Sequence, residues 1–329
     1  MSELITLNPG QTTIPQFRLE IISEKPITAF RDTPTSPIVV IGSEAADTIQ
    51  AIPGGGQAGS QSRGRGSDGR SQAQNTGGDN RASYRVTGGG GNDLIVTREG
   101  FDNISGDDGD DVIRGGGGRD VISGGAGNDN LQGNAGIDII DAEDGDDIVD
   151  GGQGNDMLLG GPGRDRLFGG EGEDTLRGGA GDDTLFGGPG SDNLRGGTGN
   201  DILNPGAGRD VMKGGAGRDT FRFEAGSTGA GVGLLDRITD FQPSEDRIEL
   251  SRALLPGSGL STGRLSADRF AIVQDLDISS DTEAITEATL IYERKSGIVY
   301  YSPANGQDVP LFQLQANLTT ISASNFTIF

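Results

Sequence analysis

The chain has 329 residues, of which 60 are glycine, 49 are acidic and 26 are basic, so its formal net charge is −23 at neutral pH. This charge disfavours nucleic acid and anionic membranes as partners and favours cations. The sequence contains neither cysteine nor histidine, which excludes disulfides, His- or Cys-based zinc sites, Ser-His-Asp triads and Cys-His dyads.

Residues 1–50 are predicted to form a β-rich N-terminal cap. Phe17, Leu19 and Ile21 alternate with polar residues, and residues 38–41 are an apolar run, as in short strands. The stretch GSEAADTIQ (42–50) is a degenerate copy of the repeat described below, with Asp47 two positions before Ile49. The N-terminus has no basic stretch followed by an apolar one, so no Sec-type signal peptide is expected. No run of about 18 apolar residues predicts a membrane-spanning helix.

Residues 51–83 are rich in Gly, Ser, Gln, Arg and Asn and almost free of apolar residues, which predicts a disordered insertion. Within it, GRGSDG (64–69) matches the GxGxxG pattern, but no strand precedes it and no helix follows, so a nucleotide site is not expected. Its arginines suggest an RNA-binding tract as an alternative, which the acidic chain as a whole disfavours.

From Gly88 to Arg222 the sequence repeats every nine residues for fifteen steps without a gap. Position 4 is always glycine, position 6 is always aspartate and position 8 is always apolar. The position-6 aspartates are Asp93, Asp102, Asp111, Asp120, Asp129, Asp138, Asp147, Asp156, Asp165, Asp174, Asp183, Asp192, Asp201, Asp210 and Asp219. Positions 1 and 2 are usually Gly-Gly, but the pair is broken at 97–98, 106–107, 133–134, 142–143 and 205–206.

After residue 223 the period ends, and residues 224–329 are predicted to form a β-rich C-terminal cap. DRITDF and DRIEL suggest two short strands around a turn at residues 243–245, and TLIYERKSGIVYY suggests a hairpin with its turn at 295–297. Beyond Asp308 the tail carries no charge, and it ends in the apolar sequence FTIF.

The nine-residue period predicts a six-residue turn followed by a three-residue strand whose middle residue, position 8, points to one side. One such strand cannot bury a side chain, but two repeats joined by two turns form a flattened coil with both position-8 side chains inside. Stacked coils form a parallel sheet on each side of a thin core. The predicted fold is therefore an all-β parallel roll over residues 84–223, with two nonapeptides per coil.

Stacking places the position-6 aspartates in two columns, one at each turn edge, with neighbours about 4.8 Å apart. The block from 88 to 222 carries 27 acidic and 11 basic residues, so repulsion opposes the stack unless cations lie between successive turns. Carboxylates and backbone carbonyls are hard oxygen donors that suit calcium, because zinc prefers His or Cys and magnesium usually keeps several waters. Fifteen turns allow up to about 13 inter-turn calcium sites.

The candidate ligands are the fifteen aspartates named above, together with backbone carbonyls of the unbroken glycine pairs and their position-4 glycines. Glycine allows positive φ, which lets a turn expose its carbonyls. The carbonyl candidates are Gly151, Gly152, Gly154, Gly160, Gly161, Gly163, Gly169, Gly170, Gly172, Gly178, Gly179, Gly181, Gly187, Gly188, Gly190, Gly196, Gly197 and Gly199. Because the turns at 97, 106, 133 and 142 are degenerate, calcium is expected less firmly before residue 151.

The repeat GGAGDDTLF (178–186) and its neighbours resemble the GGxGxDxUx nonapeptide of the RTX, or hemolysin-type calcium-binding, family. The resemblance implies a right-handed parallel β-roll with calcium between turns. LDRITDFQPSEDRIELS and ERKSGIVYY resemble the C-terminal cap of that family, which implies export by type I secretion machinery through an uncleaved C-terminal signal.

The expected function is that of a secreted calcium-binding protein of the cell surface or matrix, without catalysis, whose roll folds when it meets extracellular calcium. The alternative is an exported enzyme with its active site in the flanks and the roll as an accessory. GLSTG (259–263) matches GxSxG, but Ser261 lacks a histidine base. Asp236 and Asp240 are interpreted as a detail of the cap rather than a catalytic pair, and Asp107–Asp111 as repeat rather than EF-hand. No segment suits a pore-forming toxin.

Overall fold

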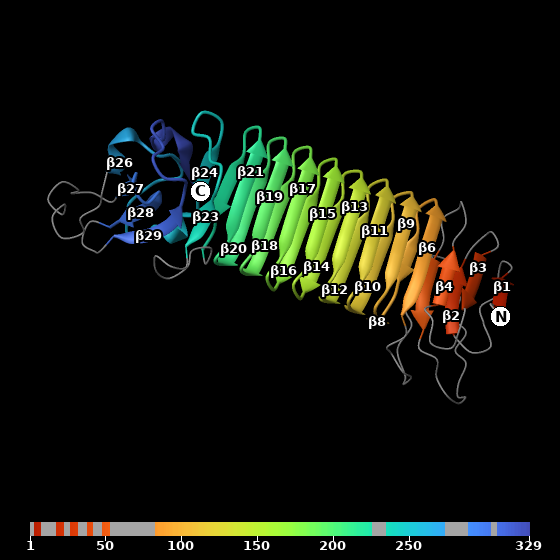
Figure 1. The fold of residues 1–329 in the computed structure, drawn as a ribbon. Coiled ribbons are helices and arrows are strands. Elements are labelled where there is room, and N and C mark those ends of the chain that lie inside the picture. The colour runs from red at the N-terminus through yellow and green to blue at the C-terminus, as the bar shows by residue number, and fades with distance from the viewer. Residues whose placement is uncertain are drawn as a thin grey trace.

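A computed structural model describes residues 83–225, 235–273, 289–303 and 308–329, together with the backbone of five strands between residues 3 and 52. Within these residues the protein is β-structure without α-helices, and three 3-10 turns lie at Arg252–Leu254, Ala267–Arg269 and Ala323–Asn325. Most strands belong to one elongated roll with the N-terminal strands at one end and the C-terminal strands at the other (Figure 1). No helix of the described residues is long and apolar enough to cross a membrane.

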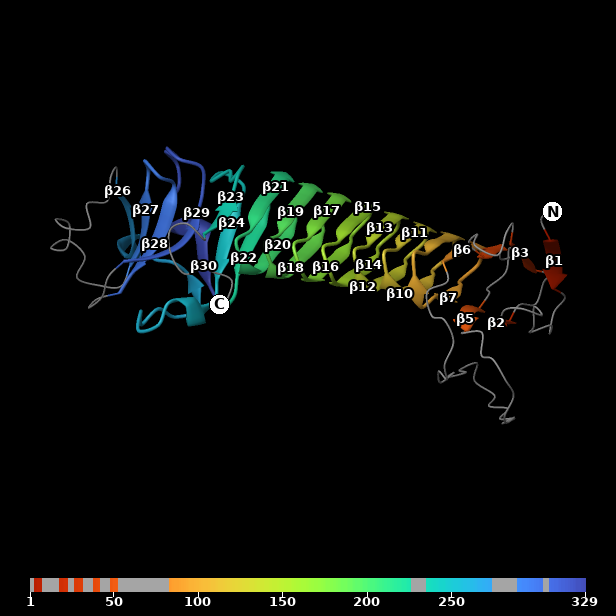
Figure 2. The ribbon, with the colours of Figure 1, turned by 60° about the horizontal axis from the view of Figure 1, so that its bottom comes forward.

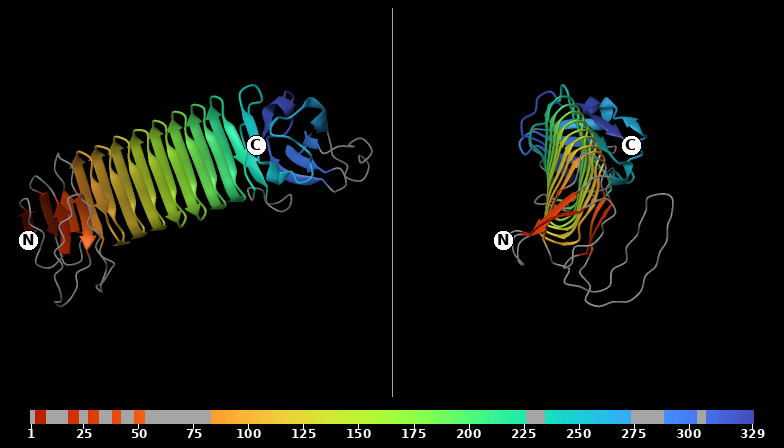
Figure 3. Two further views of the ribbon diagram at one scale, coloured as in Figure 1. Left: turned by 180° about the vertical axis from the view of Figure 1, so that it is seen from behind. Right: turned by 90° about the vertical axis from the view of Figure 1, so that its right-hand side faces the viewer.

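Two long sheets form the walls of the roll, and Figure 2 and the end-on view in Figure 3 show them facing each other across a thin interior. The first sheet contains, in spatial order, β1 (Glu3–Leu7), β3 (Ile27–Arg31), β4 (Ile38–Ile41), β6 (Tyr84–Gly90), β9 (Asn103–Asp108), β11 (Val121–Ala126), β13 (Ile139–Asp144), β15 (Met157–Pro162), β17 (Thr175–Ala180), β19 (Asn193–Thr198), β21 (Val211–Ala216), β23 (Asp236–Ile238), β29 (Val309–Gln313), β28 (Ile298–Ser302), β27 (Thr289–Glu293) and β26 (Phe270–Val273). The second contains β2 (Arg18–Ile22), β5 (Thr48–Ile52), β7 (Leu94–Val96), β10 (Val112–Gly118), β12 (Asn130–Gly136), β14 (Ile148–Gln153), β16 (Arg166–Glu171), β18 (Thr184–Gly190), β20 (Ile202–Gly208), β22 (Thr220–Phe223), β24 (Arg247–Leu250), β30 (Phe326–Ile328) and β25 (Gly263–Arg264), with β8 (Glu99–Gly100) beside β10.

Successive coils pair in parallel at an offset of 18 residues, so that Leu158 lies opposite Leu176 in the first sheet and Leu167 opposite Leu185 in the second. The parallel β-roll predicted from the nonapeptide is therefore confirmed. The prediction of three-residue strands is wrong, because most strands of the roll span six or seven residues. Pairing continues past position 9 through the glycine pair, as where Gly161 lies opposite Gly179, and only positions 4 to 6 form the turn.

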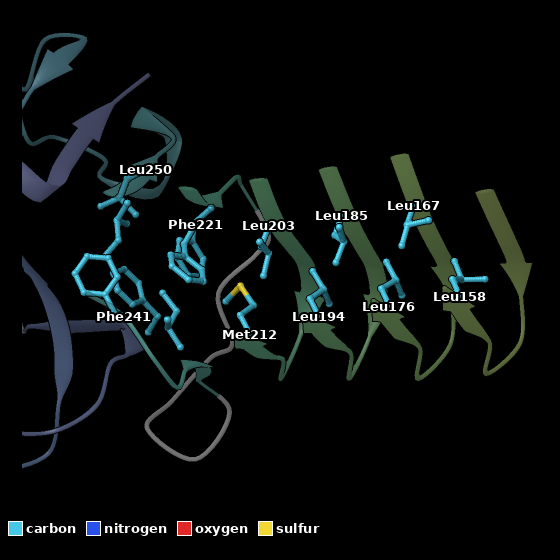
Figure 4. Packing of buried hydrophobic residues seen from close by; sticks show 14 of the residues in the cluster. Leu158, Leu167, Leu176, Leu185, Leu194, Leu203, Met212, Phe221, Phe241 and Leu250 are labelled. Atoms are coloured by element: carbon cyan, nitrogen blue, oxygen red, sulfur yellow. The ribbon is translucent and has the colours of Figure 1, made fainter. Parts of the chain in front are cut away.

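The core of the roll is one row of position-8 side chains from each sheet. All fifteen, from Ile95 to Phe221, are at most 1% exposed. Figure 4 shows the aliphatic side chains from Leu158 to Leu203 alternating between the two sheets and followed by Met212 and Phe221. The larger residues lie where the roll widens into the C-terminal segment, and there the Phe221 and Phe241 rings lie 6.0 Å apart. This row fixes the register of the turns, because a slip of one residue would turn every apolar side chain outward.

The parallel stack begins before the regular repeat. β4 pairs in parallel with β6, and β5 with β7, which places Ile49 of the degenerate copy opposite Ile95. The stretch 42–50 thus leads into a coil of the roll, although the structure puts the end of β5 at Ile52, inside the predicted insertion. The remainder of that predicted disordered segment, residues 53–82, lies outside the described residues.

The stack also continues beyond the regular repeat. β23 and β24 pair in parallel with β21 and β22, so the two strands predicted in DRITDF and DRIEL add one more coil, and residues 243–245 form the predicted turn. The hairpin predicted around residue 296 is confirmed as β27 and β28, which pair antiparallel. The tail adds β30 in parallel to β24, with Phe326 opposite Ile248, and buries Phe326 and Ile328.

Candidate metal sites along the turn edges

The position-6 aspartates form two hydrogen-bonded ladders, one along each turn edge of the roll. In each step the backbone N–H of one residue donates to Oδ1 of the aspartate in the next coil, at 2.6–3.0 Å, as from Asp147 to Asp165 and from Asp156 to Asp174. Each carboxylate therefore links two coils without any ion. This role could not be predicted from the spacing, which shows only that like charges lie close together.

The ladders run from end to end of the regular repeat and continue into the cap. One contains Asp93, Asp111, Asp129, Asp147, Asp165, Asp183, Asp201, Asp219 and Asp246. The other starts at the N–H of Tyr84 and contains Asp102, Asp120, Asp138, Asp156, Asp174, Asp192, Asp210 and Asp236. The structure thus brings together all fifteen aspartates predicted as ligands, in the two predicted columns.

The second carboxylate oxygen, Oδ2, differs from Oδ1 because in most of these aspartates it accepts no hydrogen bond. Twelve of the fifteen aspartates, all but Asp93, Asp102 and Asp210, keep Oδ2 buried without a hydrogen-bond partner among the described residues. An unsatisfied buried polar atom costs about 1–3 kcal/mol, and more when it is charged. A buried oxygen without a hydrogen-bond partner is an exception in a protein. Twelve of them in two rows indicate that these oxygens bind a ligand.

Burial also changes the acidity of these groups. It raises the pKa of Asp183 to about 7, assisted by the charges of Asp165 and Asp201 and opposed by the hydrogen bond from the N–H of Asp165. The same cause raises the pKa of Asp120, Asp147, Asp156, Asp192 and Asp219 to about 7 and that of Asp102, Asp129, Asp201 and Asp210 to about 6. Burial raises the pKa of Asp111, Asp138, Asp165 and Asp174 as well.

At twelve of the fifteen turns a position-1 glycine lies so close to Oδ2 that a side chain would clash with it, and we call the region between this glycine, Oδ2 and the next coil the cradle. A Cβ atom added to Gly160 would lie 2.3 Å from Oδ2 of Asp165 and 2.6 Å from the carbonyl oxygen of Gly178 in the next coil. At Gly169 the same two kinds of oxygen, from Asp174 and Gly187, would lie 2.6 and 2.5 Å away. A carboxylate oxygen and a carbonyl oxygen thus both lie close to the position-1 glycine, and any side chain at this position would clash with them.

The predicted carbonyl candidates occupy three places. At position 1, Gly151, Gly169, Gly178 and Gly187 turn their oxygens to the cradle of the preceding coil. The position-2 and position-4 oxygens lie against the equivalent glycine of the next coil, and those glycines have φ between 88° and 158°. These are Gly152, Gly154, Gly161, Gly163, Gly170, Gly172, Gly179, Gly181, Gly188, Gly190, Gly197 and Gly199.

The donor set fits calcium and not a metal that needs side chains alone. Among the described residues, no three acidic side chains converge closely enough to hold a metal ion, so each cradle offers carboxylate oxygen and backbone carbonyls. Calcium accepts such mixed oxygen ligands, and zinc would require the His or Cys that this chain lacks.

The broken glycine pairs do not all change the shape of their turns. Asp107, Asn134 and Glu143 replace the position-2 glycine and keep its left-handed backbone, with φ of 73–74°. The turns at 106 and 133 therefore retain their shape, and Gly106 and Gly133 still face Oδ2 of Asp111 and Asp138. The expectation that these two turns are less suited to calcium finds no support in the backbone.

The coil formed by β23 and β24, which we call the cap coil, also contributes aspartates to the two ladders, although it lacks the glycine-rich turn. Asp236 and Asp246 precede Ile238 and Ile248 by two residues, the same spacing as in the repeat. This spacing is the sequence feature from which their place in the ladders could have been predicted. Burial and the nearby Asp210 carboxylate raise the pKa of Asp236 to about 9. Asp240 accepts hydrogen bonds from the N–H groups of Gly214 and Gly215, both 3.0 Å, and so links the cap to the last repeat turn of this edge. Ser261 is exposed.

The regular repeat block matches a known family of repeats. Four copies of the RTX calcium-binding nonapeptide repeat match residues 87–122, 123–158, 159–194 and 186–221. No curated protein matches the chain.

Two solved structures are similar to parts of the chain, both solution structures of subunits of the Azotobacter vinelandii mannuronan C5-epimerase. AlgE6R3 is 31% identical, with 48% of this chain and 78% of the subunit covered and a TM-score of 0.32. AlgE6R2 is 28% identical, with 44% and 87% covered and a TM-score of 0.26. Through its regular repeat block, residues 87–221, the protein belongs to the RTX calcium-binding repeat family.

Proposed function

We propose that the protein is an exported structural component of the cell surface or matrix whose roll folds when its turns bind calcium. The observation that carries this proposal is the double row of buried, unpartnered Oδ2 atoms, all but that of Asp147 beside a position-1 glycine. In this proposal the position-6 aspartates and the position-1 carbonyls hold the ions, and the position-2 and position-4 carbonyls support the turns.

At neutral pH without calcium, the ladder carboxylates oppose folding of the roll. One unit of pKa difference corresponds to about 1.4 kcal/mol, so a carboxyl whose pKa rises from 3.8 to about 7 opposes folding by roughly 4 kcal/mol once it is ionised. Ten ladder carboxyls have a pKa raised to about 6 or 7, so their ionisation at neutral pH opposes folding throughout the roll. Bound calcium would supply the missing positive charge and the missing partner for Oδ2. Folding and ion binding then become one event.

Circular dichroism tests this directly. In calcium-free buffer at pH 7.5 the full chain should lack most of its β-signal, and millimolar calcium should restore it, in line with the affinities of about 10⁻⁴–10⁻³ M of extracellular calcium modules. Magnesium at the same concentration is the control and should restore little, because it resists losing its water. An unchanged spectrum on calcium addition would contradict the proposal.

Export rests on the same calcium dependence. Cytosolic calcium is scarce, so the chain would stay unfolded and able to pass through a type I channel. Residues 224–329, fused to an unrelated carrier, are expected to be sufficient for export by cells with such a channel. This fusion is preferable to deletion, because the tail strand β30 is buried in the fold and its loss would also impair folding. A fusion retained inside the cell would contradict this part of the proposal.

The non-catalytic role is supported by the residue inventory. Without histidine or cysteine the chain lacks the commonest general base and the commonest thiol nucleophile. The exposed Ser261 has no histidine to activate it. The alternative, an enzyme with the roll as an accessory, predicts turnover in a hydrolase and lyase screen that is lost on substitutions within 224–329.

A further inference from the structure

We infer that two of the roll's thirteen inter-turn seams are closed to calcium by side chains of the protein itself, Thr97 and Ala142. This inference rests on the proposed function and specifies which turns carry it out. A seam is the contact between two successive coils at one turn edge, and each seam contains one cradle. The deciding feature is the residue at position 1, since its side chain points into the cradle.

Position 1 is buried in every repeat, and in twelve of the fifteen it is glycine. The exceptions are Thr97, Ala142 and Pro205, and all three are buried. A Cβ at the glycine positions would come within 2.1–2.6 Å of Oδ2, so a side chain there takes the space beside the carboxylate. Pro205 belongs to the last turn of its edge and faces the cap coil, outside the thirteen seams between repeat turns.

At Thr97 a hydroxyl takes the place of an ion. Its Oγ1 donates a hydrogen bond to the carbonyl oxygen of Gly115, 2.5 Å away, which is the position-1 carbonyl of the next coil. The same side chain helps to lower the pKa of Asp102 against the larger increase caused by burial. The hydroxyl is thus bonded to the carbonyl oxygen that borders the cradle in other seams, and this hydrogen bond joins the two coils without a cation.

At Ala142 a methyl group fills the cradle. The neighbouring residues keep the regular register, with Ile140 opposite Leu158 and Glu143 opposite Gly125, so the Ala142 backbone follows that of the glycines. Its side chain is fully buried and belongs to the hydrophobic core cluster. Oδ2 of Asp147, the carboxylate of the same repeat, is buried without a hydrogen-bond partner among the described residues.

The structure thus separates two kinds of degenerate turn that look alike in the sequence. The turns at 106 and 133 have lost only the position-2 glycine and keep an open cradle. The turns at 97 and 142 have lost the position-1 glycine and have a closed one. The number of inter-turn ions is therefore expected to be at most eleven rather than thirteen, and open seams both precede and follow each closed one.

Native mass spectrometry of the full chain in calcium, with isothermal titration calorimetry, counts the ions. Thr97→Gly and Ala142→Gly should each add one calcium ion, and the double variant should add two. Ala135→Gly is the matched control, because Ala135 is exposed at position 3 and the same substitution opens no cradle. In the opposite direction, Gly124→Ala should remove one ion, since its Cβ would lie 2.3 Å from Oδ2 of Asp129.

Gly117→Ala is the control for Gly124→Ala, because its Cβ would meet only the Glu99 side chain and should leave the count unchanged. Unaltered counts in Thr97→Gly and Ala142→Gly, in a protein whose wild type binds calcium, would overturn the inference. A wild type that binds no calcium would instead overturn the proposed function. If Gly124→Ala fails to fold, the two cradle-opening variants still decide the question.

Discussion

Replacing Asp183 by asparagine is expected to stabilise the calcium-free roll and to destabilise the calcium-bound one. Asparagine keeps the Oδ1 acceptor that the N–H of Asp165 uses at 2.9 Å, so the ladder remains intact. It removes a buried carboxylate whose pKa is about 7, a gain of up to about 4 kcal/mol at pH 8 without calcium. With calcium in excess it removes an anionic donor, and a site at 100 times its Kd contributes about 2.7 kcal/mol.

Asp182→Asn is the matched control for this reversal of sign. Asp182 adjoins Asp183 and changes the net charge equally, but it is exposed, and hydrogen bonds from Asn200 lower its pKa. Its substitution should alter stability by about 0.5 kcal/mol or less in either condition. Urea unfolding in calcium measures the loss in each variant, and circular dichroism between pH 5 and pH 8 without calcium gives the pH at which each calcium-free roll unfolds. Destabilisation of the calcium-free roll by Asp183→Asn would contradict the expectation that the buried Asp183 charge opposes folding.

The pH dependence of stability is expected to have opposite signs with and without calcium. Burial raises the pKa of the ladder aspartates above 3.8, to about 6 at Asp129 and about 7 at Asp156. Because the folded state holds these protons more tightly, their contribution is fully present below pH 3.8 and is lost as the pH rises through 6 to 7. The calcium-free roll should therefore be most stable in acid and should unfold towards pH 8.

With calcium in excess, protons and calcium compete for the same carboxylates, so stability should fall as the pH drops from 8 to 5. Denaturation midpoints at pH 5 and pH 8 measure the slope in calcium, and circular dichroism between pH 5 and pH 8 measures the loss of the calcium-free roll. The effect is large because at least ten ladder carboxyls contribute to it. A calcium-free roll that is more stable at pH 8 than at pH 5 would contradict this account.

The regular part of the fold could be predicted because one chemical rule repeats fifteen times. An apolar residue at every position 8 determines which side faces the core, and the invariant Asp two residues earlier follows from that register. The sequence did not reveal that Oδ1 of each aspartate binds the preceding coil, since this depends on where the stacked backbone places an N–H group. Strand lengths were underestimated for the same reason, because the glycine pairs also take part in pairing.

The ends of the stack were harder to predict because their offsets differ from 18 residues. Ile49 pairs with Ile95 across a 46-residue separation, and Asp236 and Asp246 follow their ladder partners by 26 and 27. The same D-x-I spacing appears in both cap strands, but without the glycine-rich turn the period is lost. The difference between position-1 and position-2 substitutions was also invisible in the sequence, since it depends on which of the two Cα atoms faces Oδ2.

The most direct test is a crystal structure of the protein grown in calcium, with anomalous difference density to locate the ions. The account predicts peaks between successive coils along both turn edges from Gly151 to Gly199, each in contact with an aspartate Oδ2, and no peak at the seams of Thr97 and Ala142. The same roll with no density beside these oxygens would contradict it.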